Sequence, residues 1–352
     1  MKPTRLASAM TASVLLLTGA GRVASDNTLP KDVEWYLVNA GRFAPADLTA
    51  LESGRVIARV EEGSTDSEVI VIAAVRIRTT REQTVAYYGQ MVSFVDGKVT
   101  LAFGRFSTPP VLADVGTLTL DRDEIDALKS CKPGDCDLKI GGAGIDKIRG
   151  AVDWAAPDAA AEAQRAVQQA VVDYVTAYLQ RGDDALVTYN DSSKPVSLKD
   201  QWRGILANSL YFLEYQPVLR DYLTEYPRAS LAGGRDIIYW VKENYGLKPV
   251  LSIVHGVVYQ PPERADHTTI VQKQIFASHY YDGSLAVATV IGATEAGKPV
   301  SYVVYANRSR GDLLRGGFGG LKRKVARDQA QKAAVQTLQT MQTALEKAAG
   351  VR

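Results

Sequence analysis

PVLSIVHGVVYQPPERADHTTIVQKQIFASHYYDGSLAVATVI, residues 249–291, alternates runs of β-branched and aromatic residues with short groups of turn-forming residues. This pattern predicts β-strands separated by tight turns. It extends on both sides, from DIIYWVKE at 236–243 to VSYVVYAN at 300–307, so that five strands are expected in this region. Because short connections join antiparallel neighbours, we expect the five strands to form an antiparallel meander.

Shorter strands are expected nearer the N-terminus, with a helix among them. Thr80 can cap a helix that packs Val85, Tyr88 and Met91 on one side. Segments rich in β-branched or apolar residues predict strands before and after this helix. They are RVIARV at 55–60, EVIVIAAVRI at 68–77, VTLAFGRF at 99–106, GTLTL at 116–120 and DLKI at 137–140.

A block at about 157–226 reads as helical and interrupts the strands. Its first helix stops at Gly182, Ser197 can cap the second, and Pro217 can open the third. Six aromatic residues crowd the later part of the block. They either pack helix against helix or cover an apolar cavity, and both interpretations stay open.

One long amphipathic helix is expected at the C-terminal end, over residues 321–350, with a stop at Gly350. An apolar stripe along one side predicts that this helix packs against the sheet. The stripe consists of Leu321, Val325, Ala334, Leu338, Met341 and Leu345.

CKPGDC, residues 131–136, holds the two cysteines of the chain. Pro133-Gly134 is a turn signal, and Asp121 can cap a short helix that ends near Cys131. A zinc site needs about four ligands, and a thioredoxin-type redox centre has the spacing C-x-x-C. We therefore expect a disulfide between Cys131 and Cys136 that clasps a corner, contributing about 2 kcal/mol.

The N-terminal 25 residues have the order of features of a secretory signal peptide: a basic start, a short apolar run and Val23-Ala24-Ser25 at the cleavage position. The apolar run is shorter than a membrane span requires. We expect residues 26–352 to form a single exported domain that is periplasmic or secreted, with no stable membrane span.

The charge balance argues against a nucleic-acid partner. The chain has 41 Lys and Arg and 39 Asp and Glu, and residues 1–25 contain three of the basic residues and no acid. The remaining 38 basic and 39 acidic residues give a net charge of −1. A nearly neutral domain lacks the positive charge that phosphate backbones attract.

Two segments resemble the START and polyketide-cyclase superfamily, whose members have the helix-grip fold. AAVRIRTTREQTVAYYGQMVSF at 73–94 is similar to the first-strand-to-helix passage of that family. VSYVVYANRSR at 300–310, followed by GGFGGLKRKVARDQAQ at 316–331, is similar to the last strand leading into the final helix. The resemblance implies an α+β fold in which a curved antiparallel sheet grips the C-terminal helix and the helical block is an insertion. It also implies a cavity between sheet and helix for a lipid, sterol or polyketide-like molecule.

Polar side chains on the predicted strands are candidates for lining such a cavity. They are Tyr239, Lys242, His255, Gln274, His279, Tyr302, Tyr305 and Arg308. RGGFGG at 315–320 could cradle an anion beside Arg308 or simply let the chain bend into the last helix. Alternation places His255 on an otherwise apolar strand face, and a buried, hydrogen-bonded histidine is favoured there over a catalytic base.

Catalytic motifs are missing from the sequence: it contains no G-x-S-x-G, no H-E-x-x-H and no Walker or Rossmann glycine pattern. His255, His267 and His279 are spaced by twelve residues, and strand geometry keeps the middle one far from the other two. No metal and no cofactor are expected. The function predicted first is binding of an apolar small molecule. A cyclase- or hydrolase-type enzyme that uses a pocket histidine and an envelope-associated interaction protein are the alternatives.

Overall fold

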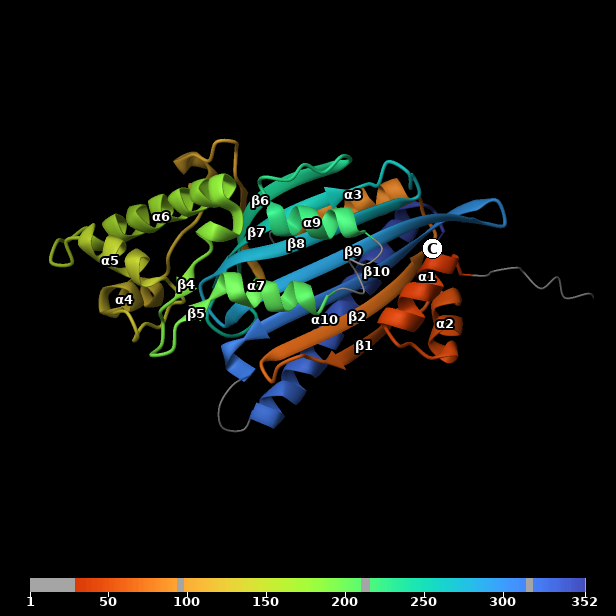
Figure 1. The fold of residues 1–352 in the computed structure, drawn as a ribbon, viewed down its shortest axis with the longest axis horizontal. Coiled ribbons are helices and arrows are strands. Elements are labelled where there is room, and N and C mark those ends of the chain that lie inside the picture. Colours follow the sequence, from red (N-terminus) through yellow and green to blue (C-terminus); the bar gives the residue numbers. More distant parts are fainter. Residues whose placement is uncertain (1–28, 94–97, 210–215, 315–318, 352) are drawn as a thin grey trace, which may run out of the picture.

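The computed structural model describes residues 29–93, 98–209, 216–314 and 319–351 of the chain. They form an α+β fold built on one curved, eight-stranded antiparallel sheet with the order β1-β2-β10-β9-β8-β7-β6-β3 (Figure 1). The strands are β1 (Ile57–Glu62), β2 (Glu68–Ile77), β3 (Thr100–Arg105), β6 (Gly234–Glu243), β7 (Val250–Tyr259), β8 (His267–Ala277), β9 (Tyr281–Glu295) and β10 (Lys298–Gly311). The predicted five-strand meander is confirmed as β6 to β10.

One face of the sheet carries α3 (Arg81–Val92) and the long C-terminal helix α10 (Gly319–Ala348). Ala334, Leu338, Met341 and Leu345 of α10 pack on the apolar side chains of β2 and β10, which confirms this part of the predicted stripe. The prediction that Val325 packs against the sheet is wrong, because 53% of this residue is exposed. The first turns of α10 border a hollow beside the β1–β2 turn. The side chain of Leu321 lies outside the described residues.

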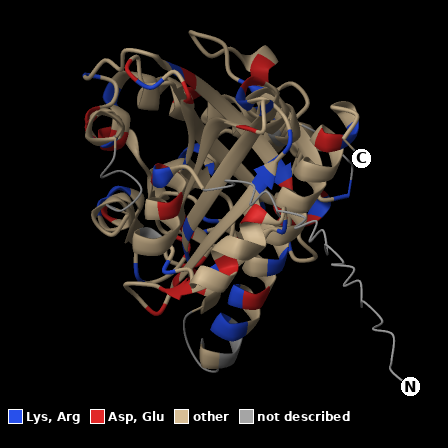
Figure 2. Ribbon diagram, turned by 90° about the vertical axis from the view of Figure 1, so that its right-hand side faces the viewer, with Lys and Arg blue, Asp and Glu red and all other residues tan. Residues whose placement is uncertain are grey.

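The opposite face is covered by the remaining helices, so that the sheet lies between two helical layers (Figures 1 and 2). The helices nearest the N-terminus cover its β2–β10 side, and the helices between residues 122 and 225 cover β6 to β9. They are α1 (Lys31–Trp35) with a π-helical turn (Tyr36–Ala40), α2 (Pro45–Glu52), α4 (Arg122–Ser130), α5 (Gly142–Gly150), α6 (Ala159–Arg181), α7 (Leu198–Ala207) and α9 (Pro217–Glu225).

Short elements complete the fold. They are the 3-10 turns Leu112–Val115, Gly182–Ala185 and Asp312–Leu314 and a small ribbon of β4 (Thr188–Tyr189) and β5 (Val196–Ser197). The second helix of the block ends at Ala207, and residues 210–215 lie outside the described residues.

The predicted caps are present at three helix starts. The side chains of Thr80, Asp121 and Ser197 each accept a hydrogen bond from the backbone N–H three residues further on. Each bond satisfies one of the amide groups that a helix start leaves unpaired, and a cap of this kind contributes about 1 kcal/mol. Local sequence therefore fixes where α3, α4 and α7 begin.

Two predicted strands are wrong: GTLTL at 116–120 and DLKI at 137–140 belong to no strand. In the first, side chains of α6 satisfy the backbone in place of a neighbouring strand. Gln164 accepts from the backbone N–H of Leu120 at 2.7 Å and donates to the carbonyl of Leu118, and Gln168 also donates to that carbonyl. Leu118 is buried under α6, so the apolar residues that suggested a strand serve helix packing instead.

The disulfide prediction is confirmed, because Cys131 and Cys136 are bonded to each other with their Cα atoms 4.4 Å apart. Cys131 follows the end of α4, and Gly134 has a positive φ of 89°, which the tight turn between the cysteines requires. Within the described ranges, none of the helices is both long and apolar enough to cross a bilayer. The predicted signal peptide, residues 1–25, lies outside them.

Candidate functional site

The sheet separates the eight residues that the sequence singled out. Successive strand residues point to opposite faces, so two residues that are an odd number of positions apart lie on opposite faces of the sheet. Tyr239, Gln274 and Tyr305 lie on the face of α3 and α10, Lys242, His255, Tyr302 and Arg308 lie on the opposite face, and His279 lies in the turn after β8.

The three residues on the α10 side join two others in a group that we call the tyrosine cluster: Tyr88, Tyr239, Gln272, Gln274 and Tyr305. The hydroxyl of Tyr88, on α3, donates to Gln272 Oε1 at 3.2 Å. The Nε2 of Gln272 donates in turn to the hydroxyl oxygen of Tyr239 at 2.9 Å. A chain of hydrogen bonds therefore runs across this face from the helix to β8 and β6.

Gln274 contributes an unsatisfied acceptor to the cluster. Its Nε2 donates to Ser252 Oγ at 3.0 Å, but its buried Oε1 has no hydrogen-bond partner. The residue is only 9% exposed. Leaving a buried acceptor unpaired costs about 1–3 kcal/mol. A donor from a bound molecule would remove this cost.

The tyrosines of the cluster are neutral at physiological pH. Burial raises the pKa of Tyr305 to about 12 and raises the pKa of Tyr88 and Tyr239. Each hydroxyl can therefore both donate and accept a hydrogen bond. The apolar side chains of Val241, Val254 and Phe103 pack with Tyr239, so the cluster combines an apolar wall with polar groups. An ionisable group near Tyr239 is Glu243, and burial raises its pKa.

His255 lies on the opposite face in a closed network. Its side chain is fully buried, with Nδ1 2.9 Å from the Tyr178 hydroxyl and Nε2 2.9 Å from Asp236 Oδ1. Burial lowers the pKa of His255 against the opposing effect of Asp236. A neutral ring satisfies both contacts when Nε2–H donates to the carboxylate and Nδ1 accepts from Tyr178. The prediction of a buried, hydrogen-bonded histidine is confirmed here.

Asp236 is the accessible end of this network, because 37% of its side chain is exposed. The hydroxyl of Tyr222 donates to its Oδ2 at 2.6 Å. Although burial works to raise the pKa of Asp236, the hydrogen bonds from His255 and Tyr222 lower it. The network therefore ties α6 and α9, both from the helical insertion, to β6 and β7.

The other candidates on this face are occupied by internal partners. Each donates to a carboxylate of another element: Lys242 Nζ to Glu124 Oε2 at 2.6 Å, Tyr302 to Glu295 Oε1 at 2.6 Å, and Arg308 Nη1 to Glu68 Oε2 at 3.0 Å. His279 Nδ1 lies 3.2 Å from Ser278 Oγ. The glycine-rich segment beside Arg308 falls largely outside the described residues. These partners give the four candidates structural roles.

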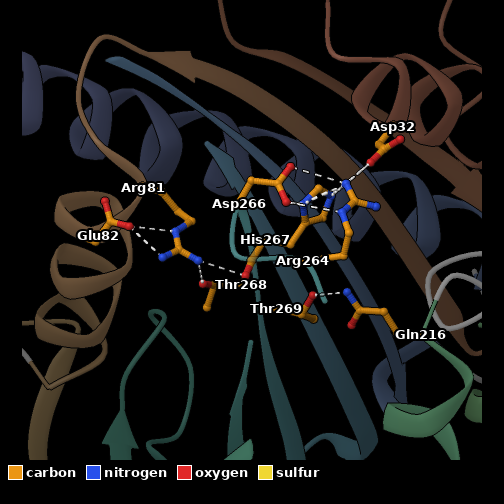
Figure 3. A network of polar contacts seen from close by, with 9 residues as sticks. All are labelled: Asp32, Arg81, Glu82, Gln216, Arg264, Asp266, His267, Thr268 and Thr269. Carbon is orange, nitrogen blue, oxygen red and sulfur yellow. Dashed lines mark hydrogen bonds and ion pairs between the residues drawn. The ribbon is translucent and has the colours of Figure 1, made fainter. Parts of the chain in front are cut away.

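A second polar network, which the sequence did not indicate, surrounds the start of β8 (Figure 3). His267 is the first residue of β8, directly after the β7–β8 turn, and its Nε2 lies 3.2 Å from Asp32 and its Nδ1 3.1 Å from Asp266. Arg264 also contacts Asp32, which belongs to α1. The network fastens α1 to the sheet.

In the part of the chain that the structure describes, no group of three or more His, Cys, Asp or Glu residues is arranged to hold a metal ion.

No protein-family model matches the sequence, and no curated protein shows significant similarity to it. The functional assignment therefore rests on the geometry of the chain itself.

Proposed function

We propose that this protein binds a largely apolar small molecule against the sheet face between α3 and α10, at the tyrosine cluster. The observation that carries the proposal is the unpaired, buried Oε1 of Gln274. A buried acceptor without a partner is costly, and on the same sheet face as the neutral tyrosines of the cluster it points to a ligand that supplies a hydrogen-bond donor.

The surroundings of that acceptor favour an uncharged ligand. The tyrosines stay neutral, and the glutamines offer hydrogen bonds without charge. Binding sites of this kind hold apolar molecules and orient them with a few polar contacts. A lipid, sterol or polyketide-like molecule with a hydroxyl group has both properties.

The same proposal places the protein outside the cytoplasm, in the periplasm or secreted. The sequence features of residues 1–25 and the bond between Cys131 and Cys136 support export, because disulfides persist in oxidising compartments. The protein would then carry its ligand between an outer and an inner compartment or hold it for another protein.

The test compares two glutamines that share a low exposure and an unpaired Oε1 but lie on opposite faces of the sheet. Gln216 is also 9% exposed, also has an unpaired Oε1, and donates through Nε2 to Thr269, but it lies on the face of α9. We expect Gln274→Leu to weaken binding of the fluorescent sterol dehydroergosterol about tenfold, the effect of about 1.4 kcal/mol. Gln216→Leu should leave binding unchanged.

Native mass spectrometry of the purified protein gives the complementary measurement, because a retained ligand adds its mass directly. Loss of this mass in Gln274→Leu, but not in Gln216→Leu, is the expected result. If neither the sterol nor any retained ligand is bound by the unmodified protein, the proposal is wrong.

A second candidate function is acid–base catalysis, and the His255–Asp236 pair is the observation that favours it. Substrate would have to meet the exposed side of Asp236, because His255 itself is fully buried. A hydrolysis screen that compares Asp236→Asn with the unmodified protein tests this candidate, which predicts an activity that the variant loses.

A further inference from the structure

A polar hollow lies between the β1–β2 turn and the first turns of α10, away from the tyrosine cluster. Its volume is about 500 Å³. The hairpin contributes acidic side chains to one wall, and the helix contributes three basic side chains and Asp328 to the other; Figure 2 shows basic and acidic residues along the helices. The charged residues of the lining are Glu61, Glu62, Asp66, Arg323, Lys324, Arg327 and Asp328.

The two walls carry opposite charges that mostly do not reach each other. Arg323 lies 3.6 Å from Asp66, an ion pair across the hollow. Among the described residues, the side chains of Glu62, Lys324 and Arg327 have no hydrogen-bond or ion-pair partner. If these groups paired directly, the hollow would close.

Two polar atoms of the lining are buried without a hydrogen bond, one on each wall. They are Nε of Arg327 on the helix and Oε1 of Glu61 on the strand. The nearest ionic contact of Glu61 is Arg59, on its own strand, at 3.6 Å, which is longer than a hydrogen bond. One wall therefore has an unused donor and the other an unused acceptor.

We infer that this hollow binds a small zwitterion, a molecule with an ammonium group and an oxyanion such as a phosphate or carboxylate. The oxyanion would contact Arg327 and Lys324. The ammonium group would contact Glu61 and Glu62. A ligand with one charge alone would leave the opposite wall unpaired, so the site selects for both.

The experiment titrates the full-length mature protein with O-phosphoethanolamine by calorimetry, and with phosphate and ethanolamine separately. We expect the zwitterion to bind at least about tenfold more tightly than either half, since each additional charge-assisted hydrogen bond contributes on the order of a factor of ten. Equal affinity for phosphate and O-phosphoethanolamine, or no binding of the zwitterion at millimolar concentration, overturns the inference.

Variants assign the two walls. Arg327→Gln should weaken binding of the zwitterion and binding of phosphate to the same extent. Glu61→Gln should weaken binding of the zwitterion, with Glu62 keeping part of the contact to the ammonium group, and should not weaken binding of phosphate. Lys332→Gln, an exposed position further along the same helix, is the matched control and should change neither. If Lys332→Gln weakens binding as much as Arg327→Gln, only general charge attraction is present and the inference fails.

A sedimentation experiment with lipid vesicles determines whether the bound zwitterion is a lipid headgroup or a small solute. Sedimentation with phosphatidylethanolamine vesicles that free O-phosphoethanolamine competes away identifies a lipid headgroup. Binding of the free compound without sedimentation identifies a small solute. Both results support the zwitterion site, and neither depends on the sterol measurement, because the hollow and the tyrosine cluster share no residue.

Discussion

Replacing Leu338 by aspartate tests whether the sheet holds α10 through its apolar stripe. Leu338 is 2% exposed and belongs to the cluster that α10 forms with β2 and β10. Removing a buried leucine side chain costs about 2–5 kcal/mol. The side chains clustered with Leu338 are apolar or aromatic, so the new carboxylate is placed among groups that do not solvate a charge. A buried charge left without its partner costs about 3–5 kcal/mol more.

The sum, about 5–10 kcal/mol, is comparable with the whole stability of a domain, about 5–15 kcal/mol. We therefore expect Leu338→Asp to be unfolded or to melt far below the unmodified protein. Thr337→Asp, at the neighbouring exposed position, is the control and should change the melting temperature little. Thermal unfolding followed by circular dichroism measures both.

A pH series separates the effect of the charge from the effect of the lost side chain. Burial raises the pKa of a carboxyl, so its protonated form is favoured in the folded state. The deficit of Leu338→Asp relative to the unmodified protein should shrink as pH falls, by up to about 1.4 kcal/mol per pH unit between the folded and unfolded pKa. If Leu338→Asp melts like the unmodified protein at pH 7, α10 is not packed against the sheet as described and the reasoning is refuted.

Three other predictions concern stability. Cys131→Ser should lower the free energy of unfolding by about 2 kcal/mol in urea while sterol binding persists; a loss of binding at a temperature where the variant is folded would contradict the purely structural role of the disulfide. Because the pKa of His255 is lowered on folding, the unfolded chain takes up a proton first, and stability should fall as pH drops below about 6.5; His255→Gln should flatten this part of the pH profile, and an unchanged slope would count against it. Burial works to raise the pKa of Glu68, but Arg308, Ser64 and Arg310 lower it below its ordinary value. The carboxylate of Glu68 therefore stabilises the fold above about pH 4.3, and this stabilisation is lost as pH falls through the lower pKa of the folded state. Glu68→Gln should lower the free energy of unfolding by about 3–5 kcal/mol at pH 7 and by less at pH 3, and equal losses at both pH values would show that charge is not the cause.

The elements that sequence predicted well are those whose signals are local. The caps at Thr80, Asp121 and Ser197 depend on a side chain and a backbone group three residues apart, and both are visible in the sequence. The stripe of α10 follows from helical periodicity alone. The strand prediction for residues 116–120 was wrong because their hydrogen-bond partners, Gln164 and Gln168, lie more than forty residues away on α6.

The candidate site shows a different limit. Tyr302 and Tyr305 are three residues apart, as are Tyr239 and Lys242, so strand alternation alone assigns the members of each pair to opposite faces. Which face α10 occupies depends on long-range packing. Irregularities in the ladder, such as the one between Ile253 and Val254, also limit how far alternation can be counted along a sheet. The unpaired state of Gln274 Oε1 depends on all its spatial neighbours and has no signal in the sequence.

The order of the strands constrains when the protein can fold during its synthesis. β2 lies between β1 and β10, and Ile77 is paired with Ser301, more than two hundred residues later. Until the ribosome has delivered β10, EVIVIAAVRI is an open, apolar strand edge of the kind that promotes aggregation. Nascent chains that end before residue 298 should therefore remain bound to chaperones, and the native sheet should close only after the last strand emerges. Under the proposed export, a chain that crosses the membrane unfolded would meet this requirement, because its strands could pair only on the far side.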